Sequence, residues 1–235
     1  MSEKFDDYKI QEGCTVQPQT KKELVDIIKR TCKRKGWNCD LNFIDTSKIT
    51  DMSRLFANIP TCFGGYGFRK FNCDISKWNT SNVTDMHDMF YNAKFFNHPL
   101  NNWEVSNVTD MSSMFDGATK FNQPLDKWNV SNLEILAYMF YEAKNFNQPL
   151  NNWNTSKVTS MSRMFKKAIS FNQPLDEWDT KNVSKILDIT DMFKDAENFD
   201  NKIPSLKNFE FKRFDDKCFL LGLSHKYAEK HQHDF

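Results

Sequence analysis

The sequence predicts an α/β solenoid, in which the chain winds into stacked coils with one short strand and one helical turn per 25-residue coil. An internal repeat predicts the coils. Its five tryptophans recur every 25 residues, at Trp78, Trp103, Trp128, Trp153 and Trp178. The composition agrees, because hydrophobic residues form only 39% of the 235 residues, yet 22 of them are Phe. A mostly polar chain with many aromatic residues places them at special positions, and a fixed period lets each unit bury its apolar face against its neighbours.

Other residues repeat with the same period. Phe-Asn pairs begin at Phe71, Phe96, Phe121, Phe146 and Phe171, and Met-Phe pairs begin at Met89, Met114, Met139 and Met164. We expect each recurring residue to form a column through the core. The Asn beside each Phe is expected to form a ladder whose amides bond turn backbones that would otherwise be unsatisfied.

The pattern inside one unit predicts its elements. β-Branched residues follow the tryptophan and favour a short strand; in one unit they are Val105, Val108 and Thr109. The next apolar residues have helical spacing, at Met111, Met114 and Phe115, and Thr109 or Asp110 is placed to cap that turn. A proline such as Pro124 then breaks any longer helix.

Helices are predicted at both ends. Thr20-Lys-Lys-Glu23 is a capping box, and Gly36 ends the helix that follows. A closing helix is expected over residues 218–227 and a loose tail over 231–235. These features divide the chain into a helical N-terminal cap (1–40), a solenoid of about six to seven repeats (41–206) and a C-terminal cap with its tail (207–235).

The stretch from Trp103 to Leu125, which contains Ser-Asn-Val-Thr-Asp-Met and Phe-Asn-Gln-Pro-Leu, resembles a known repeat. It is similar to the 25-residue repeat of the BspA-like leucine-rich repeat surface-protein family, also called the Mycoplasma-type lipoprotein repeat. The resemblance implies a leucine-rich-repeat-like solenoid and a recognition role, often at a bacterial surface. It implies no shared enzyme activity.

Charge and hydropathy bear on location and partners. The net charge is +1, which argues against a strongly basic nucleic-acid binder, and no apolar run is long enough for a membrane helix. The first residues, 1–8, do not have the pattern of a secretory signal. On this ground we expect a cytoplasmic protein, whereas the family resemblance points to the cell surface or to secretion.

The six cysteines, Cys14, Cys32, Cys39, Cys62, Cys73 and Cys218, contain no CxxC pair, and we expect reduced thiols. A zinc site that combines Cys32 and Cys39 with His225, His231 or His233 fits no known ligand spacing. No catalytic motif is present either. We therefore expect no metal, no cofactor and no enzyme activity.

The expected function is binding of another protein through the solenoid surface. If side chains alternate in and out after each tryptophan, two columns of residues face solvent. The candidate contacts in these columns are Asn79, Glu104, Asn129, Asn154 and Asp179, followed by Ser106, Ser131, Ser156 and Lys181. The alternative is a nucleic-acid or anionic-surface binder that uses the basic N-terminal helix. Its basic residues are Lys21, Lys22, Lys29, Arg30, Lys33, Arg34 and Lys35.

Overall fold

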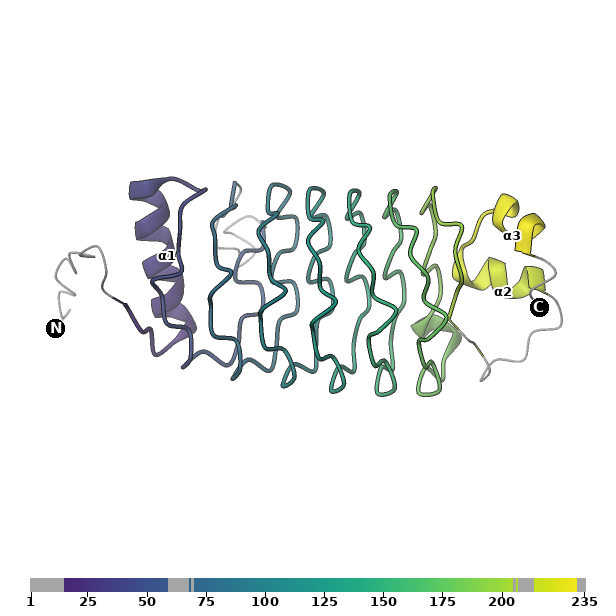
Figure 1. Cartoon of the computed structure of the whole chain (residues 1–235), viewed down its shortest axis with the longest axis horizontal. Helices are drawn as coiled ribbons and strands as arrows, with labels where there is room; N and C mark the ends of the chain where they lie inside the picture. Colours follow the sequence, from purple (N-terminus) through teal and green to yellow (C-terminus); the bar gives the residue numbers. More distant parts are fainter. Residues whose placement is uncertain (1–14, 59–67, 69, 205, 207–213, 232–235) are drawn as a thin grey trace.

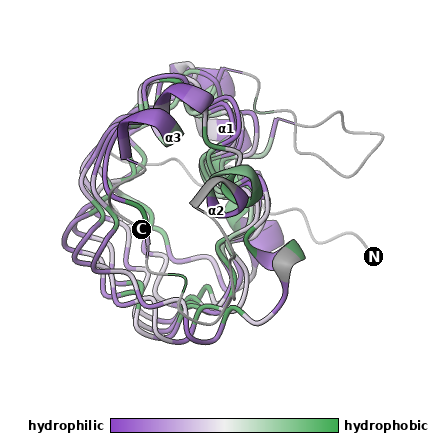
Figure 2. Cartoon of the chain, turned by 90° about the vertical axis from the view of Figure 1, so that its right-hand side faces the viewer, coloured by the Kyte–Doolittle hydropathy of each residue, from purple (hydrophilic) through white to green (hydrophobic). Residues whose placement is uncertain are grey.

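The computed structural model describes residues 15–58, 68, 70–204, 206 and 214–231. The repeats form a row of coils stacked along the long axis of the molecule (Figure 1). Viewed along that axis, successive coils overlay one another (Figure 2). Helix α1 (Lys21–Lys35) lies at one end of the row, and helices α2 (Phe214–Leu221) and α3 (His225–His231) lie at the other.

The predicted α/β, leucine-rich-repeat-like solenoid with helical caps is wrong. The described residues contain no β-sheet, and the β-type pairing between coils consists of isolated parallel bridges, such as Asp85 to Asp110 and Asp110 to Ile135. The predicted helical turn in each coil is also missing. Among the described coils, only the short 3-10 helix η2 (Ile186–Asp188) has helical hydrogen bonding.

Consecutive tight turns replace the predicted helical turn. The Met89 N–H donates to the Met86 carbonyl at 3.2 Å, and the Tyr91 N–H donates to the Asp88 carbonyl at 3.0 Å. Asp88 and Asn92 both have φ 54°, in the left-handed region that interrupts a right-handed helix. Apolar residues at i, i+3 and i+4 meet on one side in successive turns as they do in a helix, so the spacing does not distinguish the two.

The same turns explain why no sheet forms. Alternate residues bond the next coil: the Asp88 N–H donates to the Ser112 carbonyl and the Phe90 N–H to the Met114 carbonyl, both at 2.9 Å. The N–H of Met89, between them, bonds within its own coil. Because the remaining bonds close turns, neighbouring coils do not share a continuous ladder of the kind that defines paired strands.

The predicted core columns are confirmed. Phe115 stacks on Phe140 with ring centroids 5.6 Å apart, and Phe121 stacks on Phe146 at 6.0 Å. All four rings are fully buried. The recurring tryptophans and methionines are buried as well; they are Trp78, Trp103, Trp128, Trp153, Trp178, Met89, Met114, Met139 and Met164. Stacking aromatic side chains buries large apolar areas in a core only one coil wide.

Hydrogen bonds align these columns from coil to coil. The Trp128 indole N–H donates to the Leu100 carbonyl of the preceding coil at 2.9 Å, and the other repeat tryptophans make the equivalent bond. The predicted Asn ladder is confirmed: the Asn122 amide oxygen accepts the Asn147 backbone N–H at 2.9 Å. Gln148 donates to the same oxygen at 2.9 Å. Each ladder therefore satisfies a polar group that would otherwise be unpaired at a turn.

The N-terminal helix follows its sequence signals. The Thr20 hydroxyl accepts the Glu23 backbone N–H at 3.2 Å, and Gly36, at φ 89°, ends the helix. Leu24 and Ile28 are buried beneath α1. The residues that begin and end this helix are therefore as predicted.

The C-terminal end differs from its prediction. Two helices, α2 and α3, replace the single helix expected over residues 218–227, because Gly222 adopts a left-handed φ of 71° between them. A Cβ at this position would lie 2.7 Å from the Cβ of Lys194, so only glycine fits there. His231 belongs to α3 rather than to a tail, and residues 232–235 lie outside the described residues.

Candidate functional site

The two columns predicted to contact a partner lie on the surface. Asn79, Glu104, Asn129 and Asn154 are exposed and Asp179 is half-buried. In the second column, Lys181 is exposed and Ser106, Ser131 and Ser156 are half-buried. The buried residues on either side of Glu104 are Trp103 and Val105, so the predicted alternation after the tryptophan is confirmed.

The first column has a structural task in every coil. The Glu104 carboxylate accepts the Ser106 N–H at 2.9 Å, and the Asn129 amide oxygen accepts the Ser131 N–H at 3.2 Å. The equivalent bond from Asp179 reaches the Lys181 N–H at 2.9 Å. A short side chain that accepts the N–H two residues later stabilises a turn. The variation among Asn, Glu and Asp in this column is therefore variation among acceptors that serve the same turn.

A second surface varies more from coil to coil. One column contains Asp88, Ser113, Tyr138, Arg163 and Asp191, all with φ between 53° and 60°. The next contains Asn92, Gly117, Glu142, Lys167 and Asp195, again with positive φ throughout. An L-residue costs roughly 1–2 kcal/mol in this conformation, whereas glycine is free of the penalty. Most coils nevertheless hold a large or charged side chain here.

We define the aromatic–basic patch as Tyr138, Tyr141, Arg163, Lys166 and Lys167. The Arg163 guanidinium lies over the Tyr138 ring, 5.4 Å from its centroid. It also donates a hydrogen bond to the Tyr138 hydroxyl. The Lys167 ammonium lies over the Tyr141 ring at 5.5 Å. The two tyrosine rings are 5.9 Å apart. These contacts hold long side chains in a fixed arrangement while they stay half-buried.

Acidic groups precede the patch along the same face. Burial, together with the charges of Glu142 and Asp88, raises the pKa of Asp116 to about 7. Glu142 itself pairs with Lys167 at 2.7 Å, and this contact lowers its pKa. Beyond the patch the face is acidic again, where the Asp191 carboxylate lies 3.6 Å from the Arg163 Nε and 3.5 Å from the Lys166 Nζ.

The basic side of α1 is largely solvent-exposed. Lys22, Arg30, Lys33, Arg34 and Lys35 are exposed. Lys21 instead donates to the Asp51 carboxylate at 3.0 Å and to the Ser53 hydroxyl at 2.8 Å. The exposed cations lie mostly near the C-terminus of the helix, where the helix dipole favours them.

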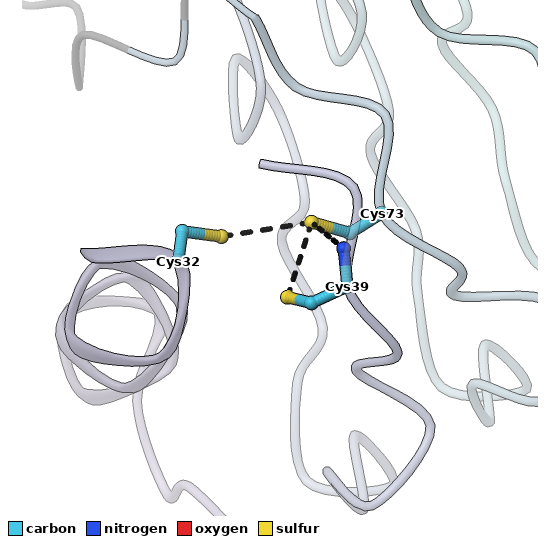
Figure 3. Close-up of side chains that lie close together, drawn as sticks. All are labelled: Cys32, Cys39 and Cys73. Atoms are coloured by element: carbon cyan, nitrogen blue, oxygen red, sulfur yellow. Dashed lines mark hydrogen bonds between the residues drawn. The ribbon is translucent and has the colours of Figure 1, made fainter. Parts of the chain in front are cut away.

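Three thiols converge at the N-terminal end of the row. The Sγ atoms of Cys32 and Cys39 lie 3.6 and 3.4 Å from the Sγ of Cys73. All three sulfurs lie within 4.8 Å of one another and point toward a common centre (Figure 3). Cys32 and Cys73 are buried, Cys39 is half-buried, and none of the three forms a disulfide.

Three segments of the chain supply this thiol cluster. Cys32 projects from α1, Cys39 follows that helix, and Cys73 lies on the next coil (Figure 3). Cys39 and Cys73 occupy the same position on neighbouring coils, since the Cys39 carbonyl accepts the Asp74 N–H at 2.9 Å. Later coils place His98 and then glutamines in this column. The sequence signal for the cluster is therefore a cysteine in place of the recurring Gln.

The thiols perturb one another. Hydrogen bonding from Cys32, together with the backbone N–H of Cys39, lowers the pKa of Cys73 to about 7 despite its burial. Burial, followed by the contact with Cys73, raises the pKa of Cys39 to about 11. The hydrogen bond to Cys73 and then burial raise the pKa of Cys32. Cys73 is therefore the first of the three to become a thiolate.

His225 and His231 are not near these sulfurs. His225 and His231 lie on α3, at the opposite end of the molecule (Figure 1). His231 instead contacts the Asp200 carboxylate at 2.9 Å. His233, Cys14, Cys62 and the N-terminal residues 1–8 lie outside the described residues. None of the helices in the described part of the chain has the length and apolar character required to span a membrane.

Comparison with known proteins gives one match. The profile of the family described as "Mycoplasma protein of unknown function, DUF285" matches residues 26–144 and 125–221. No curated protein and no solved structure matches the chain significantly. The two matched segments include the repeats, α1 from Asp26 onward and α2. The chain therefore belongs to the DUF285 family of Mycoplasma proteins of unknown function.

Proposed function

We propose that the chain is a non-enzymatic repeat protein that binds another protein through the aromatic–basic patch. The observation that carries this proposal is the pair of columns in which the backbone repeats but the side chains do not. Tyr138, Arg163 and Lys167 occupy left-handed positions that glycine would fill without a conformational cost. Unfavourable backbone conformations of this kind cluster at functional sites.

The chemistry of the patch supports a protein partner. Tyrosine and arginine are enriched among the residues that contribute most to protein–protein binding. The contacts of Arg163 with Tyr138 and of Lys167 with Tyr141 fix these side chains before binding, which reduces the entropy lost when a complex forms. Carboxylates lie on both sides of the patch, at Glu142 and at Asp191, so acidic and basic groups alternate along this face, a feature that orients a partner with complementary charges.

The resemblance to BspA-like surface proteins supports the same proposal, because that family implies a recognition role. Affiliation with that family, and with it a location at the cell surface, forms part of the proposal; a cytoplasmic location is the alternative. Protease added to intact cells should cleave the protein if it is displayed at the surface. A chain that is cut only after lysis contradicts the surface location.

The test compares two double variants as baits in a lysate of the source cells. Tyr138→Gly/Arg163→Gly removes two patch side chains at positive φ, so relief of the backbone partly offsets the lost ring contacts. The matched control, Asn129→Asp/Asn154→Asp, adds charge to the exposed column while it keeps both turn acceptors. Captured proteins are identified, and binding is then measured with the purified partner.

We expect the patch variant to lose the partner and the control to retain it, with both variants folded. Loss of the partner from the control alone would instead assign recognition to the exposed column containing Glu104, Asn129 and Asn154. Retention of the partner by both variants overturns the proposed site.

The exposed cations of α1 favour a second candidate function, binding to nucleic acid or another anionic surface. Lys33, Arg34 and Lys35 lie together at the end of the helix. A complex formed through phosphates weakens steeply as salt increases, whereas most protein interfaces weaken less. Binding to an oligonucleotide that falls steeply with salt, and that is lost in a Lys33→Glu/Lys35→Glu variant, would support this alternative over the aromatic–basic patch.

A further inference from the structure

We propose that Cys32, Cys39 and Cys73 bind one thiophilic metal ion, Zn²⁺ or Cu⁺, at the N-terminal end of the coils. This inference is independent of the partner-binding proposal, because the thiol cluster lies on different residues and has a different readout. Its basis is the convergence of three sulfurs from three segments of the chain on one point (Figure 3).

The separations of the sulfurs suit a shared ion. With Zn–S bonds of about 2.3 Å, two thiolates of a tetrahedral site lie roughly 3.8 Å apart. The contacts of 3.6 and 3.4 Å to Cys73 are slightly shorter, and the remaining pair lies within 4.8 Å. Small adjustments of side-chain torsions therefore suffice to place all three sulfurs around one ion.

The type of ligand selects the type of metal. Thiolates are soft ligands that favour Zn²⁺ and Cu⁺ over Mg²⁺ and Ca²⁺, which prefer oxygen. Three thiolates complete a trigonal Cu⁺ site, whereas tetrahedral Zn²⁺ takes one further ligand, such as water, on the half-buried side at Cys39. Binding is ligand exchange: each thiol that coordinates the metal releases its proton to solvent, and nothing is oxidised or reduced.

The placement of the sulfurs also argues for a metal over a disulfide. A disulfide between Cys39 and Cys73 would use two sulfurs and leave Cys32 unpaired beside it. A metal uses all three and links α1 to two neighbouring coils. Because the sulfurs converge only when these segments are packed together, the ion stabilises the folded N-terminal end.

The experiment titrates the reduced, metal-free full chain separately with Zn²⁺ and with Cu⁺ under anaerobic conditions. Bound metal is counted after gel filtration, and the melting temperature is measured with and without the ion. Sulfur-to-metal charge-transfer absorption on Cd²⁺ or Cu⁺ binding identifies thiolate ligands. We expect one ion per chain, a higher melting temperature, and reversal of both by a chelator.

Single variants test the three ligands. Cys32→Ser, Cys39→Ser and Cys73→Ser should each lower the affinity by more than the roughly 10–100-fold that loss of an outer-shell partner costs. The matched control is Cys218→Ser, since Cys218 is also buried and forms no disulfide but lies on α2 at the other end of the row. This control should bind the metal as the wild type does.

A complementary variant keeps the test decisive if a serine substitution prevents folding. In the triple variant Cys14→Ser/Cys62→Ser/Cys218→Ser, the only cysteines that remain are the three proposed ligands. This variant should still take up one ion. The proposal is overturned if the reduced wild type binds neither ion, or if this triple variant folds but loses uptake. The proposal is also overturned if folded single variants still take up the metal. It is overturned as well if Cys39 and Cys73 form a disulfide and the protein takes up no metal after that disulfide is reduced.

Discussion

The middle coils, residues 78–178, and the N-terminal end, residues 21–74, use the same positions differently. In the middle coils, the column that follows the ladder asparagines contains His98 and then glutamines, and Gln148 donates to Asn122 of the preceding coil. At the N-terminal end the same column contains Cys39 and Cys73, which face Cys32 of α1. The outer side of the first coil has no further repeat packed against it. The residues of this column at that end therefore need not make the cross-coil contacts of the repeat.

Cross-coil bonding differs in the same way. In the middle coils, the Asn147 N–H bonds to the side chain of Asn122, its counterpart one coil earlier. At the N-terminal end, the Asn72 N–H bonds to the Trp37 backbone carbonyl instead, at 2.8 Å. Neighbouring coils in the middle of the row therefore repeat the same hydrogen bonds, whereas the terminal coil makes different ones. Four measurements test this difference between the two regions.

The largest expected effect is loss of a stacked tryptophan. Trp128→Ala removes a side chain that stacks 6.2 Å from Trp153 and donates to Leu100, so it should cost about 3–5 kcal/mol of unfolding free energy. Trp37→Ala, at the N-terminal end, should cost less, because Trp37 is only partly buried. Denaturant unfolding measures both variants. Equal losses of unfolding free energy in the two variants would show that stacking in the middle coils gives Trp128 no additional stability.

The Asn ladder should contribute less than the tryptophan column. Asn122→Ala leaves the Asn147 N–H and the Gln148 amide without their shared acceptor, at a cost of about 1–3 kcal/mol. Asn122→Asp keeps a side-chain oxygen as acceptor and serves as the control. If the alanine variant unfolds at the same denaturant concentration as the wild type, the ladder does not contribute to stability.

A smaller effect is expected from pH. Burial and nearby carboxylates raise the pKa of Asp116 to about 7, above the roughly 3.9 of an unfolded aspartate. The folded chain therefore holds this proton more tightly, and the resulting stability is present below about pH 4 and lost as pH rises through about 7. Asp116→Asn should remove this loss, so the melting temperature of the variant should depend less on pH between about pH 4 and 7.

A carboxylate at the N-terminal end provides the control of opposite sign. Although burial opposes it, hydrogen bonds from Ser53 and Lys21 lower the pKa of Asp51. Its stabilising contribution is present above the unfolded pKa and is lost as pH falls through the lower folded value. Asp51→Asn should therefore change the acidic side of the profile alone. Parallel profiles for wild type and Asp116→Asn would contradict the assignment to Asp116.

The smallest expected effect is that of a reductant. None of the four described cysteines, Cys32, Cys39, Cys73 and Cys218, forms a disulfide. Adding a reductant to metal-free protein should therefore leave its melting temperature unchanged. A large decrease would reveal a disulfide that stabilises the fold, and mass spectrometry of the alkylated, non-reduced protein would then locate it.

The period, the core columns, the Asn ladder and the N-terminal helix could all be predicted from the sequence. The reason is that each depends on residues whose role is set by spacing: Trp128 and Phe121 recur with the coil, and Thr20 caps the helix that follows it. Exposure of Glu104 followed from the alternation beside the buried Trp103. Such local patterns can be read from the sequence because the same structural environment recurs in each coil.

The turns, the patch and the thiol cluster could not be predicted from the sequence, because they depend on how distant segments pack. The spacing of Met111, Met114 and Phe115 suits a helical turn and consecutive tight turns equally, and the backbone of Ser113, at φ 53°, selects the turns. Tyr138 and Arg163 are 25 residues apart in sequence and meet only because their coils stack. Cys32 and Cys73 meet because α1 packs on the first coils, a contact between distant segments that no repeat period encodes.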